Sequence, residues 1–331
     1  MKKLIFKVFC KKLLFLLLAM TTILISCSSN NSAKLHNIPN ETAESLEIYF
    51  CPKDDCSAVL ADKINSANNS VYCAFYDLDL KNVVEALETK KGSADVRLVI
   101  DSSTYKNELK KNRPVLDDNN QLMHDKFCVI DNYITLTGSF NPTFNDNNKN
   151  NNNLEVIYSK TLAKNYNDEF SELFRRSFGK GALVESPVLI INGIQIENYF
   201  CPEDKCEDRV ANLIKNSNQS VYFMTFSFTS EEIADALLRN KNIKIKGIFD
   251  RLQSSSKYSQ YKRLKEFGLN VSISNGKGKL HHKVFIIDNQ TVITGSFNPT
   301  SAGDGKNDEN IIIIHNSKTA KKFLEEFENI S

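Results

Sequence analysis

The sequence has little glycine and proline and few long apolar runs, and these low contents exclude several classes of protein. Its 331 residues include only 12 glycines and 7 prolines, which argues against a collagen-like fibre. It has one long apolar run, which argues against a polytopic membrane protein. A content of 41% hydrophobic and 25% charged residues is that of a folded chain, and the length suits two domains of ordinary size.

The chain also lacks a strong net charge. Its formal charge is +2, but the first 26 residues hold five lysines and no acid. Without them, 37 basic residues face 40 acidic ones, and the remainder carries a formal charge of −3. This near balance argues against tight, non-specific binding of nucleic acid through bulk charge.

The single long apolar run, Leu13–Ile25, follows these lysines. It is short for a membrane span and typical of a signal peptide over residues 1–26. The run leads into Leu24-Ile25-Ser26-Cys27, which resembles the lipobox of bacterial-type lipoproteins. The resemblance implies a lipidated Cys27 and an extracytoplasmic, membrane-anchored lipoprotein of the cell envelope, with residues 27–46 as a polar tether. An uncleaved apolar anchor is the alternative.

An internal repeat organises the rest of the chain. The segment Ile48–Cys56 recurs as Asn198–Cys206, 150 residues later. Gly138–Thr143 recurs as Gly295–Thr300, at an offset of 157, so the second copy has seven additional residues, which we place around 253–278. Such a repeat predicts two similar domains related by a pseudo-twofold axis.

The two predicted domains cover residues 47–180 and 181–331, and each reads as α/β. The runs Val71–Tyr76 and Val221–Phe228 are typical of strands, and each is followed by a helical pattern and a further strand. Alternating helices and strands predict mixed sheets flanked by helices. The asparagine-rich stretch Asn145–Asn153 is interpreted as a mobile loop.

Both copies contain the same set of residues suited to phosphate chemistry. They are His124, Lys126, Asp131, Gly138, Ser139 and Asn141 in the first copy, and His281, Lys283, Asp288, Gly295, Ser296 and Asn298 in the second. A histidine and a lysine two apart on a strand project from the same face. Lysine binds phosphate as a point charge, and serine and asparagine add neutral donors, so the set suits a phosphate diester.

Each set is expected to form a hairpin. Asp131-Asn132 is a turn signal, and a two-residue turn there would place His124 opposite Ser139; a shift by one residue would place it opposite Asn141. In both registers the Gly-Ser-x-Asn segment lies beside the His-x-Lys pair. Asp131 and its equivalent Asp288 lie about 16 Å along the strand from the lysines, so we interpret them as turn-stabilising. The glycine of each set permits close backbone approach.

The complete pattern, His-x-Lys-x4-Asp-x6-Gly-Ser-x-Asn, resembles the signature of the phospholipase D superfamily, and both copies match it at every fixed position. The resemblance extends from about Glu47 to the end of the chain. It implies one active site between the two halves of a single chain, and therefore a monomer. It implies His124, Lys126, His281 and Lys283 as catalytic residues and Ser139, Asn141, Ser296 and Asn298 as phosphate-binding residues.

The resemblance also implies a mechanism that needs no metal and no other cofactor. One histidine attacks phosphorus to give a phosphohistidine, and the other protonates the leaving alcohol. Glu309 matches an acid that the family places beside a catalytic histidine, whereas the first copy has Asn152 at the equivalent position. A carboxylate beside His281 would favour its cation, which makes His281 the acid and His124 the nucleophile.

The cysteines fall into two groups. Cys51 and Cys56 are matched by Cys201 and Cys206, which predicts disulfides within each pair outside the cytoplasm, or a four-thiolate zinc site. Four cysteines allow three pairings, and the sequence alone does not choose among them. Cys73 and Cys128 are matched by Phe223 and Phe285, so we interpret this second group as reduced core residues.

We assign no function to the three remaining histidines. His36 lies in the tether, His282 is matched by Asp125, and His315 reads as a strand residue. The segment Val188–Ile196 predicts a hairpin around Asn192-Gly193 without a counterpart in the first copy.

Three functions remain open on the sequence. Hydrolysis of a phospholipid headgroup ranks first, because a membrane-tethered enzyme outside the cell meets phospholipid at high local concentration. A nuclease of the same superfamily ranks second, because members this compact include nucleases. A non-catalytic lipid- or phosphate-binding module ranks third, because a binding protein would not require both histidines.

Overall fold

The computed structural model describes residues 38–331 apart from 45, 119 and 241. The predicted signal peptide, the lipidation site Cys27 and His36 lie outside the described residues. Within the described part of the chain, no helix combines the length and the apolar character needed to cross a membrane.

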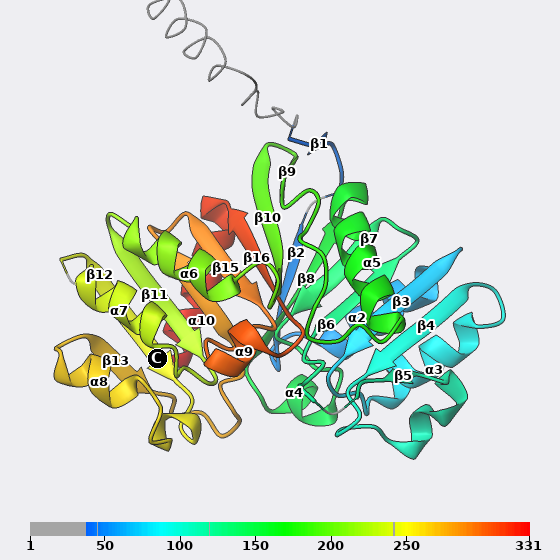
Figure 1. Cartoon of the computed structure of the whole chain (residues 1–331), viewed down its shortest axis with the longest axis horizontal. Coiled ribbons are helices and arrows are strands. Elements are labelled where there is room, and N and C mark those ends of the chain that lie inside the picture. Colours follow the sequence, from blue (N-terminus) through cyan, green and yellow to red (C-terminus); the bar gives the residue numbers. More distant parts are fainter. Residues whose placement is uncertain (1–37, 45, 119, 241) are drawn as a thin grey trace, which may run out of the picture. The chain divides into compact units, whose positions relative to one another are not determined.

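The first half is built on a seven-stranded mixed sheet with the order β2-β8-β7-β6-β3-β4-β5 (Figure 1). Its strands are β2 (Glu47–Cys51), β3 (Ser70–Phe75), β4 (Asp95–Ile100), β5 (Val115–Leu116), β6 (Lys126–Ile130), β7 (Ile134–Gly138) and β8 (Asn152–Tyr158). Strands β3, β4 and β5 are parallel, whereas β6, β7 and β8 form an antiparallel meander.

The second half has a nine-stranded sheet with the order β1-β9-β10-β16-β15-β14-β11-β12-β13. Its strands are β1 (Asn40–Glu41), β9 (Val188–Ile191), β10 (Ile194–Cys201), β11 (Ser220–Thr225), β12 (Lys244–Phe249), β13 (Asn270–Ile273), β14 (Lys283–Ile287), β15 (Thr291–Gly295) and β16 (Glu309–His315). β9 and β10 form the hairpin predicted around Asn192-Gly193. Residues 40–41, which the sequence assigned to the tether, pair with β9.

Helices cover both faces of each sheet, which confirms the predicted α/β class. They are α2 (Cys56–Ser66), α3 (Lys81–Lys90) and α5 (Lys160–Phe174) in the first half, and α6 (Cys206–Lys215), α7 (Glu231–Arg239) and α10 (Ser317–Ile330) in the second. Shorter helices are η1 (Asn107–Asn112), α4 (Phe144–Asn148), η2 (Gln253–Ser255), α8 (Tyr261–Glu266) and α9 (Ser301–Gly305). Because both faces are covered, central strands such as β16 are buried throughout most of their length.

The packing of α5 joins the two halves. Ser159 caps this helix by accepting a hydrogen bond from the backbone of Leu162 at 3.0 Å. The buried face of α5 includes Tyr166 and Phe170, in a core that also contains Phe127 of β6 and Phe200 of β10. The two sheets therefore share a hydrophobic core, and the interface between them is fixed by apolar packing.

The disulfides agree with the sequence for one group of cysteines and correct it for the other. Cys51 pairs with Cys56 and Cys201 with Cys206, so the predicted pairings are confirmed and the zinc alternative is not formed. Cys73 of β3 and Cys128 of β6 also form a disulfide, so the interpretation of this pair as reduced is wrong. They lie directly opposite each other in neighbouring strands, with Cα atoms 4.1 Å apart. The equivalent residues of the second half are phenylalanines, so the repeat gave no indication that these two cysteines pair.

The motif hairpins have a register that the sequence did not predict. Ile130 pairs with Ile134, and Ile287 with Thr291, so each connection contains three residues rather than two. The first two residues of each connection have positive φ; at Asp131 and Asn132 these angles are 52° and 54°. Neither predicted partner of His124 is therefore correct, although the Gly-Ser-x-Asn segment still runs beside the His-x-Lys segment.

The aspartates of both motifs stabilise turns, as predicted. Asp131 accepts hydrogen bonds from the backbone of Asn68, Asn69 and Ser70 at 2.7–2.8 Å. Asp288 does the same for the equivalent residues before β11. Each carboxylate thereby fixes the start of a central strand to the hairpin beside it.

Candidate active site

Each motif histidine lies where the two halves meet, two residues before a central strand rather than on it, because β6 begins at Lys126 and β14 at Lys283. The backbone N–H of His124 donates to the carbonyl of Asp308 at 3.0 Å, and that of His281 donates to the carbonyl of Asn151 at 2.9 Å. Short parallel bridges between the halves continue these contacts. The backbone itself therefore joins the segment that carries one histidine to the opposite half.

Two aspartates at strand ends fix the residues that precede the histidines. Asp101, after β4, accepts a hydrogen bond from the backbone of Met123 at 3.0 Å. Asp250, after β12, accepts one from the backbone of Leu280 at the same distance. Both acids are almost fully buried, so these bonds are shielded from water.

An aromatic ring packs against each histidine. Tyr76 lies 4.8 Å from the ring centre of His124, and Phe226 lies 4.9 Å from that of His281. The motifs do not include these residues. The sequence nevertheless contains a signal for them, because both are aromatic and lie 150 residues apart, which is the offset of the repeat.

Each imidazole is held by a side chain from the opposite half. Nδ1 of His124 lies 2.8 Å from Oε2 of Glu309, and Nδ1 of His281 lies 2.9 Å from Oδ1 of Asn152. The prediction that Glu309 lies beside His281 is therefore wrong. The segment that leads into β16 pairs with the segment of His124 across the interface, so the acid of the second half contacts the histidine of the first.

Asp146 supplies an acid on the side where Asn152 has none. Its Oδ2 atom lies 3.3 Å from Nδ1 of His281 and accepts hydrogen bonds from the backbone and side-chain amides of Asn141 at 3.0 and 2.8 Å. Burial alone would raise the pKa of this carboxyl, but the charge and hydrogen bond of His281 hold it well below its usual value. The equivalent residue is Gly303, so the repeat gave no signal for Asp146.

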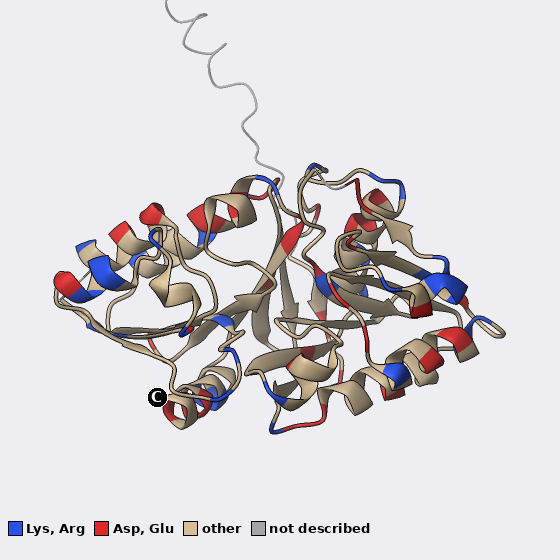
Figure 2. Ribbon diagram, turned by 90° about the horizontal axis from the view of Figure 1, so that it is seen from below, with Lys and Arg blue, Asp and Glu red and all other residues tan. Residues whose placement is uncertain are grey.

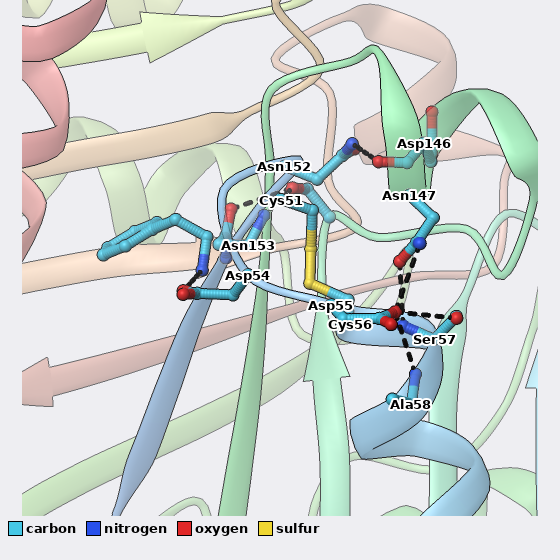
Figure 3. The surroundings of a disulfide bond; sticks show 12 residues. Cys51, Asp54, Asp55, Cys56, Ser57, Ala58, Asp146, Asn147, Asn152 and Asn153 are labelled. Carbon is cyan, nitrogen blue, oxygen red and sulfur yellow. Dashed lines mark hydrogen bonds between the residues drawn. A yellow bond between two sulfur atoms is a disulfide. The ribbon is translucent and has the colours of Figure 1, made fainter.

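The asparagine-rich segment is ordered, contrary to the expectation of a mobile loop. Asn150 donates to Asp146 Oδ1 at 2.6 Å, and Asn152 donates to the carbonyls of Asp146 and Asn150, both at 2.9 Å. Asn147 accepts a hydrogen bond from the backbone of Ser57 at 2.8 Å, just beyond the Cys51–Cys56 disulfide (Figure 3). The composition suggested a mobile loop, but these amide groups form hydrogen bonds with neighbouring side chains and with the backbone.

The two motif lysines are buried behind the histidines. Their exposed fractions are 2% for Lys126 and 3% for Lys283. Lys126 donates to the backbone carbonyl of His124, and Lys283 donates to that of His281 at 2.8 Å. Each ammonium group is therefore oriented by the histidine of its own motif.

Burial controls the titration of this cluster. It lowers the pKa of His124 well below its usual value and, together with the charge of Lys283, lowers that of His281 to about 4. It also lowers the pKa of Lys126 to about 8 and that of Lys283 to about 7, and raises that of Glu309 to about 8. A bound phosphate diester would bring in a negative charge, which favours the protonated form of the cationic groups.

Both histidines line one cavity of about 790 Å³. The amides predicted to bind phosphate, Asn141 and Asn298, line it as well. The predicted partners Ser139 and Ser296 are fully buried and are not among its lining residues, so their direct contact with phosphate stays a prediction. A larger cavity of about 990 Å³ between α3 and η1 contains no motif residue.

The two serines help to join the halves behind this cavity. Ser139 donates to Asn153 Oδ1 at 2.8 Å, and Ser296 accepts from the backbone of Asn310 at 2.8 Å. Asn153 then contacts Nδ1 of His282, and Asn310 donates to Asp125, at 2.8 and 2.6 Å. His282, which the sequence left without a role, is thus a buried contact between the halves.

Known proteins share sequence similarity with both halves of this chain. The family described as Cardiolipin synthase, PLD-like domain, matches residues 60–174 and 210–331, well over half of the chain. The phospholipase D of Rickettsia conorii is 31% identical over 162 residues, which cover 44% of this chain and 81% of that protein. The mitochondrial cardiolipin hydrolase of Mus musculus is 31% identical over 124 residues, 37% of this chain and 56% of that protein.

A solved structure shares the fold over nearly the whole chain. The phosphatidylserine synthase of Haemophilus influenzae superimposes with a TM-score of 0.65 at 14% identity, and the match covers 91% of this chain and 90% of that protein. The likeness includes both halves, whereas each relative above matches less than half of this chain. With two matches to the family and two intact motifs around one cavity, this chain belongs to the phospholipase D superfamily of phosphodiesterases.

Proposed function

We propose that this protein hydrolyses the headgroup phosphodiester bond of phospholipids through a phosphohistidine at His124. The observation that carries the proposal is the shared cavity, in which histidines from two separate motifs meet with two buried lysines behind them. A binding module would need the cations, but it would not need two imidazoles in crossed contact with acids of the opposite half.

In the first step, Nε2 of His124 attacks phosphorus. An N–P bond forms and the bond from phosphorus to the headgroup oxygen breaks, while His281 gives a proton to that oxygen. The direct contact of Glu309 with Nδ1 fixes the ring of His124, and the ionised form of this carboxyl stabilises the positive charge that develops on the ring. The ionised carboxylate of Asp146 favours the proton on His281, which suits the general acid.

In the second step, water replaces the imidazole. His281, now neutral, takes a proton from water as the new P–O bond forms and the N–P bond breaks. The product is phosphatidic acid, and both histidines return to their starting states. The same residue thus serves first as acid and then as base.

The two lysines stabilise the charge of the reacting phosphate. They are fixed by the histidine carbonyls and excluded from water, so their positive charge acts in a medium of low dielectric. Because each is buried beside other cations, an anionic ligand relieves part of the electrostatic cost of keeping both protonated.

Phospholipid is preferred as substrate for two reasons. Relatives that match at about 31% identity are named phospholipase D and cardiolipin hydrolase. The predicted lipid anchor at Cys27, which we keep as a proposal together with a place in the cell envelope, would hold the enzyme at a membrane. A nuclease is the second candidate, favoured by four exposed basic residues at the edge of the cavity.

The test compares two substrates in the presence of chelator. His124→Ala should abolish turnover of phosphatidylcholine vesicles and of a soluble aryl phosphodiester, and should remove any acid-labile phosphoenzyme trapped by rapid quenching. His281→Ala should lower vesicle turnover by about 10²–10⁴-fold but spare much of the first-turnover burst of phenolate from the aryl diester, because a phenolate of low pKa leaves without a proton.

The matched control is His315→Ala, since this histidine is bonded to Glu197 away from the cavity. It should retain activity on both substrates. In His281→Ala, equal losses of vesicle turnover and of the phenolate burst would contradict the assigned roles. Loss of turnover on chelation would contradict the metal-free mechanism.

A further inference from the structure

The edge of the active-site cavity combines exposed apolar and basic side chains. We name this set the mouth surface, and it consists of Phe144, Lys149, Arg251, Leu252, Lys277 and Lys279. All but Phe144 line the cavity that contains the histidines, and Lys149 Nζ lies 5.3 Å from the ring centre of Phe144. The segments that carry them, α4 and the loops after β12 and β13, lie at the lower edge of the molecule in Figure 1.

Two large apolar side chains of the mouth surface are open to solvent. Phe144 is 56% exposed and Leu252 is 66% exposed. Leu122, which lines the same cavity, is 37% exposed. Exposed apolar groups that gather at a polar site, rather than lying singly, indicate a surface that contacts something apolar.

The charge of the mouth surface is positive. Its four basic residues are exposed, and among the described residues none of the four forms an ion pair with an acid. The acids that line the same cavity do not offset this positive charge at the surface. Asp77 forms an ion pair with Lys106 at 2.6 Å, and Asp146 and Asp250 are buried. The chain beyond residue 26 is slightly acidic, and Figure 2 shows both signs of charge spread over both halves, so the basic character is local.

We propose that the mouth surface docks on an anionic phospholipid bilayer, with Phe144 and Leu252 inserted among the acyl chains and the four basic residues at the headgroups. The inference rests on the proposed lipid substrate and deepens it by naming the surface that meets the membrane. Basic residues around apolar ones are the pattern of an interfacial membrane contact. A nucleic acid would use the charges but would leave the leucine and the phenylalanine exposed to water.

The docking orientation has a consequence for catalysis. The cavity opens within the mouth surface, so contact with the bilayer would bring a headgroup phosphate directly to the histidines. A diester dissolved in water would reach the same histidines without docking. Variants of the mouth surface should therefore affect vesicle hydrolysis far more than hydrolysis of a soluble diester.

The absence of tryptophan from the sequence provides a direct test. In the full-length chain carrying His124→Ala, which leaves the lipid intact, Phe144→Trp introduces the only tryptophan, which can be excited apart from the tyrosines. Vesicles of phosphatidylcholine and phosphatidylglycerol with brominated acyl chains should quench it and shift its emission to the blue. Leu183→Trp is the matched control, because Leu183 is 69% exposed but lines a separate cavity beside α5, and it should not be quenched.

Removing charge tests the electrostatic part in the same reporter. Lys277→Gln with Lys279→Gln should raise the vesicle concentration for half-maximal quenching by about fivefold for each charge. The matched pair Lys110→Gln with Lys111→Gln, exposed on η1, should leave it unchanged.

The outcomes separate this inference from the proposed function. The docking proposal would be overturned if, with vesicles present, a water-soluble quencher reached the tryptophans at positions 144 and 183 equally. It would also be overturned if the variant with Lys277→Gln and Lys279→Gln lost plasmid binding while its quenching by lipid stayed unchanged. If the reporter docks while the protein without His124→Ala releases no headgroup from the same vesicles, docking stands and the proposed function fails.

Discussion

At the scale of single residues, the two halves provide their acids in different ways. His124 contacts Glu309, which lies at the start of β16, whereas His281 contacts Asn152 at the equivalent place and receives its acid from Asp146 on α4. Two imidazoles in one cavity need different environments to act as nucleophile and acid. The unequal partners provide that difference within a nearly symmetric arrangement.

Removal of the acid beside His281 should weaken proton transfer selectively. Asp146→Asn keeps the shape and the contacts to Asn141 but removes the charge that favours protonated His281, so vesicle turnover should fall by about 10–100-fold. Turnover of a soluble aryl diester should fall much less. Steady-state rates on both substrates measure the difference.

The control for this variant lies on the equivalent helix. Asp304→Asn changes an acid of α9 that accepts a hydrogen bond from the backbone of Glu207 at 2.8 Å and does not line the cavity. Its activity should stay within about twofold, as for a substitution outside the catalytic machinery. Similar losses in both variants on both substrates would mean that Asp146 acts only in folding.

At the scale of elements, each motif strand ends in a glycine that the backbone requires. Gly138 has a φ of 136°, and a Cβ there would lie 2.4 Å from the carbonyl oxygen of Asn153. Gly295 has a φ of 141° and would meet the carbonyl of Asn310 at 2.3 Å. These contacts bring the hairpin and its neighbouring strand together at the interface between the halves.

Substitution at this position should destabilise the fold. Gly138→Ala either displaces the backbone of β8 or leaves position 138 of β7 in a strained conformation. The free energy of unfolding should fall by about 1–3 kcal/mol. Gly305→Ala is the control, because a Cβ at Gly305 would meet nothing within 4 Å. Urea denaturation measures both; a Gly138→Ala midpoint equal to that of Gly305→Ala would show that the strand relaxes without cost.

At the scale of the whole molecule, buried acids connect folding to pH. Glu155 on β8 is fully buried, accepts a hydrogen bond from Asn153 at 2.8 Å, and has its pKa raised by burial from 4.5 to about 8. The folded chain holds this proton where the unfolded chain releases it. The stability that Glu155 contributes is therefore complete below about pH 4.5 and is lost as pH rises through 8.

Glu155→Gln should reduce this dependence. Its free energy of unfolding should fall less than that of the unmodified chain between pH 5 and pH 8, by at most about 1.4 kcal/mol for each pH unit. Glu85→Gln, at an exposed site on α3, should follow the unmodified chain. Thermal or urea unfolding at the two pH values provides the measurement, and parallel pH profiles for all three proteins would contradict the burial of an ionisable group.

Sequence alone determined the features that depend on local pattern and on repetition. The two copies, the α/β class and the hairpin at residues 188–196 all follow from residues near one another in the chain or repeated at a fixed offset. The sequence named Cys51 and Cys56 as candidate partners, and the structure chose this pairing among the alternatives. The same pattern predicted turn roles for Asp131 and Asp288, because strand geometry places them far from the lysines.

Only the tertiary structure decided which residues meet across the two halves. The family resemblance indicated that Glu309 matters, but it did not indicate that Glu309 reaches His124, because that contact joins residues 185 positions apart. The repeat gave no signal for Asp146, because its counterpart is a glycine. It gave none for the Cys73–Cys128 disulfide either, because the equivalent residues of the second half are phenylalanines. Repetition records what the halves share, whereas the pairing of one half with the other is set by packing around α5 and by the buried hydrogen bonds at the interface.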